Sequence, residues 1–144
     1  MKCGRFLLIL LIISHLSSAQ TIVREPVEEV VAVVDRTPIL ASDIDLARLL
    51  GIIDRAPGMS EAEHRSALLD ARIQLEVQYR DLESSGALYR LELDVVETRR
   101  TLVAPAGGEE ALAAKLEAAG LGDADVDEIA LRICAANAYA DQRL

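Results

Sequence analysis

The chain has 144 residues, of which 51% are apolar and 27% charged, and its formal net charge is −9 at pH 7. These proportions are typical of one globular domain and exclude an intrinsically disordered chain, which would be less apolar. The acidic balance disfavours binding to nucleic acids and to anionic membrane surfaces, because both repel a protein of the same charge sign.

Residues 1–19 have the pattern of a secretory signal peptide. Lys2 and Arg5 precede an apolar run at 6–13, and small residues at 17–19 are typical of a cleavage site. The run is too short to cross a membrane, which takes about 20 apolar residues. We therefore expect export to the periplasm, with no membrane anchor after cleavage. Removal of the two cations and no acid moves the net charge from −9 to −11.

After cleavage, Cys134 is the only cysteine that remains, so no intramolecular disulfide is available. Its apolar surroundings at 131–136 predict a buried thiol that behaves as a small hydrophobic residue. Residues 20–26 are expected to form a flexible lead-in that stops at Pro26. The remaining residues, 27–144, are expected to form one domain.

The domain is predicted to open with a short β-hairpin. Val30–Val34 is β-branched and almost continuously apolar, as in a strand that is covered on both faces. Residues 35–38 have turn chemistry, and Pro38 removes a backbone donor, so the Ile39–Leu40 arm should be short and lie at an edge.

Two helices are predicted next. Ser42, with Asp45 three residues later, is typical of a helix start, and apolar positions continue from Ile44 to Ile53 on most sides of this helix. Residues 56–58 should end it. Ser60 and Glu63 have the spacing of a capping box for the longest helix, which is expected over about 60–83.

Three further helices complete the predicted fold. The first is expected from about Leu91 to the loop at 105–108, the second over Glu109–Ala119 with Gly120 just past its end, and the third from Asp123 or Asp125 towards the C-terminus. The sequence therefore predicts a mainly α fold of about five helices packed with a short N-terminal β-hairpin.

We find no motif for catalysis, for metal binding or for a cofactor. His64 is the only histidine after signal removal, and a di-iron bundle would need its Glu61 pairing twice, so we expect a solvated histidine in a helix's first turn. No serine or cysteine lies in a nucleophile elbow, and Gly107-Gly108 lacks the spacing of a phosphate-binding loop. The acidic groups near 109 and 123 are expected to be solvated residues of helix first turns.

The opening stretch resembles the start of the SurA N-terminal domain, a family of periplasmic chaperones and peptidyl-prolyl isomerases. The likeness is carried by Val30-Val31-Ala32-Val33-Val34-Asp35 and then Pro38-Ile39-Leu40-Ala41-Ser42-Asp43-Ile44, and it extends more loosely over 27–144. The isomerase domains that follow in that family have no counterpart before Leu144. The resemblance therefore implies a module that holds polypeptides, and the chain is not expected to be an enzyme.

The expected function is that of an exported chaperone-like module, which holds unfolded or newly exported polypeptides without cofactor or metal. We expect the working surface on the helices and not on the hairpin. The candidate peptide-binding residues are aliphatic positions of the first two helices: Leu46, Leu49, Leu50, Ile53, Leu69, Ile73 and Val77.

Three alternatives remain open from the sequence. The chain could be a structural or interaction subunit of a periplasmic complex that forms a homodimer through the Ile44–Ile53 helix. It could instead act in trans with a separate parvulin-type isomerase. It could also be a degenerate member of the family.

Overall fold

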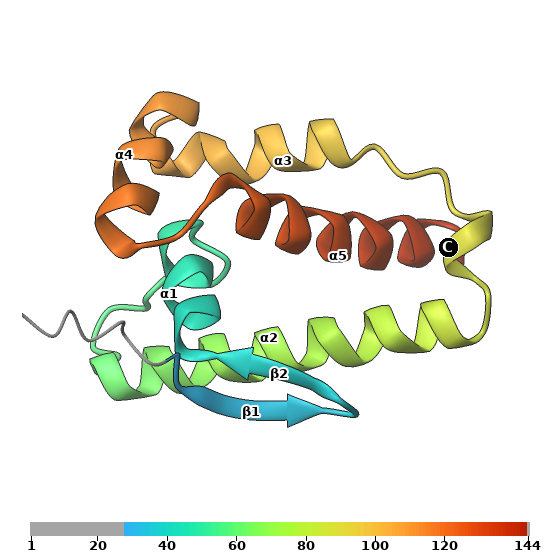
Figure 1. Cartoon of the computed structure of the whole chain (residues 1–144), viewed down its shortest axis with the longest axis horizontal. Coiled ribbons are helices and arrows are strands. Elements are labelled where there is room, and N and C mark those ends of the chain that lie inside the picture. The colour runs from blue at the N-terminus through green and yellow to red at the C-terminus, as the bar shows by residue number, and fades with distance from the viewer. Residues whose placement is uncertain (1–27, 144) are drawn as a thin grey trace, which may run out of the picture.

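A computed structural model describes residues 28–143 (Figure 1). The expected signal peptide and the whole lead-in at 20–26 lie outside the described residues. The described chain is mainly helical, with a two-stranded antiparallel sheet at its N-terminal side, which confirms the predicted fold class. The sheet contains β1 (Val30–Val34) and β2 (Thr37–Leu40).

Five α-helices follow the sheet. They are α1 (Ala41–Leu49), α2 (Glu61–Ser84), α3 (Val95–Val103), α4 (Glu109–Ala119) and α5 (Asp123–Asp141). Short 3₁₀ turns lie at Leu88–Arg90 and Ala104–Ala106. Helix α5 packs against α2 on one side and α3 on the other, while α1 and α4 close one end of this layer (Figure 1).

The core lies where α1, α2, α4 and α5 meet the inner face of the hairpin. It consists of these buried residues: Ile39, Ile44, Leu46, Ala47, Leu50, Leu68, Val103, Ala106, Leu112, Leu116, Val126 and Ile129. A second, smaller cluster of Leu82, Ala87 and Ala135 joins α2 to α5 near the other end. Cys134 is also buried, as its apolar surroundings predicted.

The predicted capping box of the longest helix is present. The Ser60 amide donates to Glu63 Oε2 at 2.8 Å, and the Glu63 amide donates to Ser60 Oγ at 3.2 Å. Helix α4 ends before Gly120, which has a left-handed backbone with φ of 71°, as expected from its sequence. Local signals of this kind identify helix ends because the groups that satisfy the free backbone amides are close in sequence.

The start and end of the first helix were predicted wrongly. Its N-cap is Leu40, whose amide donates to Asp43 Oδ2 at 2.7 Å, while the Ser42 hydroxyl donates to Glu28. Asp43 can cap from inside the helix because α1 begins directly after β2. The helix ends at Leu49 and not at 56–58, because Gly51 takes a left-handed conformation with φ of 65°.

The third helix also begins later than predicted. It starts at Val95 and not near Leu91, because the carboxylate of Asp94 accepts the amide of Glu97 at 2.9 Å and caps the helix there. The preceding residues form a 3₁₀ turn, Leu88–Arg90, and then an extended connection.

His64 is buried, and the prediction of a solvated histidine is wrong. Its Nε2 lies 2.9 Å from the carbonyl oxygen of Ile53. The loop between α1 and α2 folds back onto the first turn of α2, which brings this carbonyl to the ring. The histidine therefore links a loop to a helix start.

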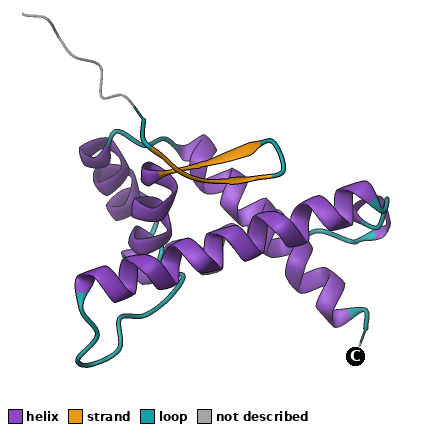
Figure 2. Ribbon diagram, turned by 90° about the horizontal axis from the view of Figure 1, so that it is seen from below, coloured by secondary structure: helices purple, strands orange, loops and turns teal. Residues whose placement is uncertain are grey.

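The prediction that Val30–Val34 is covered on both faces is also wrong. Val30 and Val33 are 54% and 62% exposed, whereas Val31, Ala32 and Val34 pack against the core. The hairpin lies at the margin of the molecule, with helices on one side only (Figure 2). A layer is missing from the outer face of β1 in the described chain.

Candidate functional site

The sequence-predicted peptide-binding residues do not form one surface. Leu46 and Leu50 lie in the core with 2% and 1% exposed, and Ile53, Leu69 and Ile73 are half-buried against it. Leu49 lines a shallow pocket between α1 and α4, and Val77 is the only exposed member of the set. Because α1 turns its apolar side chains towards the chain's own core, it offers little exposed apolar surface for a homodimer.

Exposed aliphatic side chains gather instead on the outer face of the hairpin. Val33 pairs directly with Pro38 across the two strands, and both are exposed; Val30 is exposed one step further along. A solvated strand face is usually polar, so this all-aliphatic face is unusual. Sequence reasoning placed the expected working surface on the helices and did not single out this exposed face. The continuous apolar run in β1 was the signal that could have found it.

A groove of about 480 Å³ lies between the hairpin turn and α2. Val34 and Val77 form its apolar part, and Arg36, Asp81 and Glu83 are among its charged side chains. The groove lies on the helix side of the hairpin, at its turn end, because Val34 packs towards the core while Val33 faces outward. We name Val30, Val33, Pro38 and this groove the hairpin surface.

Arg80 fixes the hairpin to α2 beside the groove. Its guanidinium donates to Thr37 Oγ1 at 2.6 Å, to Glu76 Oε1 at 3.0 Å and to Glu83 Oε2 at 2.8 Å. The hydrogen bond to Glu83, with the bond and charge of Glu76, raises the pKa of Arg80 above its ordinary value despite some desolvation. Arg80 is therefore a permanent cation that links the sheet to the helix layer.

Glu76 is the centre of a buried cluster of charges. It is 0% exposed, and its Oε2 accepts from Arg132 Nε of α5 at 2.6 Å and from Arg72 at 3.2 Å. Burial by itself would raise the pKa of Glu76, but the bonds and charges of Arg132 and then Arg72 outweigh it, so the pKa lies below its ordinary value. One buried carboxylate thus joins α2 to α5.

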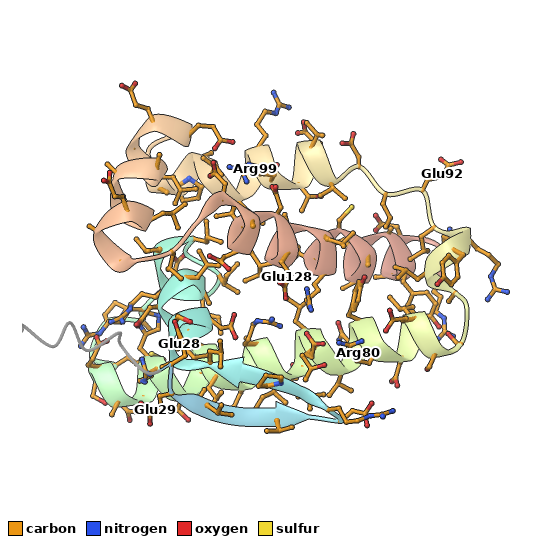
Figure 3. The ribbon with its side chains drawn as sticks, in the orientation of Figure 1. Glu28, Glu29, Arg80, Glu92, Arg99 and Glu128 are labelled. Carbon is orange, nitrogen blue, oxygen red and sulfur yellow. The ribbon has the colours of Figure 1, made fainter. Side chains whose placement is uncertain are left out.

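The outer side of Arg132 is also satisfied. Its guanidinium pairs with Glu128 at 2.9 Å and lies over the ring of Tyr79, 5.0 Å from the centroid. Glu128 is labelled in Figure 3 between α5 and α2. No buried side-chain nitrogen or oxygen in the described residues lacks a hydrogen-bond partner, so this cluster offers no free group to a ligand.

Arg99 joins three helices at the opposite side of α5. It pairs with Glu109 of α4 at 2.8 Å, and with Asp123 and Asp127 of α5 at 3.1 Å and 2.6 Å. The hydrogen bond to Glu109 and those to the two aspartates raise the pKa of Arg99, and Arg99 in turn lowers the pKa of Glu109. Three of the acids that the sequence assigned to solvated first turns are therefore paired with one arginine, and all three remain exposed.

We predict a salt-dependent loss of stability for Arg99→Gln. The three carboxylates are themselves exposed, so solvent screening limits the cost to about 1 kcal/mol at low salt. The matched control is Arg100→Gln, since within 28–143 this exposed neighbour pairs only with Glu97. Urea unfolding at low salt and at high salt measures both. The prediction would be contradicted if both substitutions lowered the free energy of unfolding equally, or if the loss caused by Arg99→Gln were the same at low and high salt.

The pocket between α1 and α4, of about 450 Å³, has little to offer a charged ligand. Of its two cations, Arg48 pairs with Asp45 and with Glu61, the latter at 2.6 Å, and Lys115 donates to the carbonyl oxygen of Ala106 at 2.8 Å. Both cations are therefore engaged within the protein.

Over residues 28–143, no group of three or more metal-ligating side chains is close enough to hold a metal ion. None of the described helices has the length and apolar character needed to span a membrane. Comparisons of the chain with protein-family models, with curated proteins and with solved structures return no match.

Proposed function

We propose that this protein is an exported, chaperone-like module that holds unfolded or newly exported polypeptides in the periplasm, without catalysis. The observation that supports the proposal is the hairpin surface, where Val30, Val33 and Pro38 are exposed together. Aliphatic surface that stays uncovered in a folded chain is typical of sites that bind another polypeptide.

The construction of the hairpin supports the same function. Its inner side is held by the core residue Ile39, and its turn end is tied to α2 through the bond from Arg80 to Thr37. The outer face is thus rigid before any client arrives, which lowers the entropy lost on binding. The groove beside Val77 adds room for a client side chain next to the strands.

The test is suppression of aggregation. An outer-membrane protein diluted from urea is mixed with a several-fold excess of the purified protein, and light scattering is followed. We expect slower aggregation and an unchanged rate of prolyl isomerisation in a peptide assay. Aggregation that proceeds unchanged would contradict the proposed function.

Substitution of Val33 by lysine tests the surface. We expect Val33→Lys to raise the protein concentration needed for half-maximal suppression by about tenfold, because a charge on this face removes its apolar contact. Stability should be retained, since exposed substitutions usually change it little. The matched control is Val96→Lys. Val96 is 80% exposed and lies on α3, which is not part of the hairpin surface. If both variants suppress aggregation equally well, the hairpin surface is not the site that binds the client.

A further inference from the structure

We propose that the segments held by this protein are aliphatic stretches flanked by basic residues, and that they bind as an added strand at the free edge of β1. This inference rests on the proposed function and names its client class. Its two parts are the backbone edge, which provides the binding mode, and the acidic residues around it, which select the client.

The backbone edge of β1 is open to another strand. The sheet has two strands, so β1 has β2 on one edge and no described strand on the other. Natural edge strands usually carry a charge or a proline that prevents further pairing, and β1 contains neither over Val30–Val34. The proline of this sheet, Pro38, lies in β2. The register is irregular between Val30 and Ala32, so the regular part of the edge is Ala32–Val34.

Strand addition fits the surface beside this edge. In that mode the backbone hydrogen bonds provide affinity, and alternate side chains of the added strand enter neighbouring pockets. The groove lined by Val34 and Val77 lies at the turn end of β1 and is large enough for an aliphatic side chain. A client strand can therefore pair with β1 and place one side chain against Val77.

The charges around the edge are mostly negative. Glu28 and Glu29 precede β1 and Asp35 follows it, so the strand has acids at both ends. Asp81 and Glu83 of α2 add to the groove, where Arg36 and Arg80 are the cations. Arg80 already donates to Glu76 and Glu83. Figure 3 shows Glu28 and Glu29 at one end of the hairpin and Arg80 towards the other.

This distribution favours a basic client over a second copy of the chain. A segment with lysine or arginine on both sides of an aliphatic stretch would place its cations beside the two acidic ends of β1. A second copy would bring the same acids and another net charge of −9, which repels. Electrostatic complementarity of this kind selects partners and accelerates their association.

Three labelled peptides test the inference with the purified protein. The first has alternating valine and threonine between two lysines at each end. The second replaces the lysines by glutamates, and the third keeps the lysines but has N-methyl groups on alternate backbone amides. Fluorescence anisotropy at low salt should give about tenfold tighter binding of the lysine peptide than of the glutamate peptide. The difference should shrink at high salt, where charges are screened.

The N-methylated peptide reports strand addition, since it keeps the charges and side chains but cannot donate along one edge. We expect its affinity to fall by about tenfold or more. In the protein, Glu28→Gln with Glu29→Gln should reduce by several-fold the preference for the lysine peptide over the glutamate peptide. The affinity for the glutamate peptide should not fall. Glu28→Gln keeps a side-chain oxygen that can accept the hydrogen bond from the Ser42 hydroxyl. Glu117→Gln with Glu110→Gln, on α4, is the control for a general loss of charge.

The outcomes separate this inference from the proposed function. If aggregation is suppressed but the lysine and glutamate peptides bind equally, or the N-methylated peptide binds as well as its parent, the client class or the strand mode is wrong and the holding function stands. If the two α4 substitutions weaken the preference as much as those at 28 and 29, the selection is not made at β1. If aggregation is not suppressed, the proposed function fails by itself.

Discussion

Replacing Glu76 by glutamine is expected to lower the free energy of unfolding by about 3–5 kcal/mol, because it breaks a buried cluster of charges. The substitution keeps the shape of the side chain but leaves Arg72 buried without its counter-charge and Arg132 with only the exposed Glu128. Both arginines are almost wholly buried, so water cannot replace the carboxylate. Urea unfolding followed by circular dichroism measures the loss.

The control for Glu76→Gln is Glu128→Gln, which removes a carboxylate from the same arginine. Glu128 pairs with Arg132 from the solvent side, so its loss should cost about 0–1 kcal/mol. A second comparison replaces Glu76, Arg72 and Arg132 together by leucine and methionine. Because three apolar side chains leave no buried charge without a partner, we expect this triple variant to recover most of the free energy of unfolding that Glu76→Gln loses. Equal stability of Glu76→Gln and wild type would show that the cluster is solvated in solution.

The same carboxylate makes the stability depend on pH in a defined direction. The pKa of Glu76 is lowered in the folded protein, so its contribution is fully present above the ordinary glutamate value of about 4.3. The contribution is then lost as the pH falls through the lowered pKa. The stability curves of wild type and Glu76→Gln should therefore converge in acid, where wild-type Glu76 is protonated too.

Substitution of Leu112 by alanine should cost about 2–5 kcal/mol. Leu112 is fully buried and, with Leu116, is the contribution of α4 to the core. Its truncation removes apolar contacts and leaves a cavity that the short helix cannot close by itself. Thermal unfolding measures the effect, with Val96→Ala on the exposed face of α3 as the control. A loss no greater than that of the control would mean that α4 is not firmly packed in solution.

The sequence predicted those elements whose signals are local. The capping box at Ser60 and the glycine after α4 lie within a few residues of the helix ends that they determine. The sequence also showed Arg72, Glu76 and Arg80 at four-residue spacing, but such a row on a helix usually faces solvent. Arg132, 56 residues later, is the partner that closes this row into a buried cluster, and nothing local connects it to Glu76.

The candidate site was predicted less well, because the side of an element that remains exposed depends on the whole fold. Leu46 and Leu50 have the spacing of a binding stripe, yet both side chains are buried in the core. Val33 belongs to a strand with the composition of a covered strand. It is exposed because no described helix packs on the outer face of the hairpin. Similarly, His64 is buried because a loop folds onto it.

The bond between Arg132 and Glu76 also bears on the order in which the protein can fold. The hairpin, α1 and α2 are synthesised first, and on α2 alone Glu76 finds only Arg72 and Arg80 one turn away on either side. The part of α2 around Glu76 has no partner from α5 until that helix, the last of the described chain, has been synthesised. Contacts over such a sequence separation form slowly, because a long loop must close before they stabilise the chain. The bond between Glu76 and Arg132 can therefore form only after α5 has been synthesised and has docked onto α2.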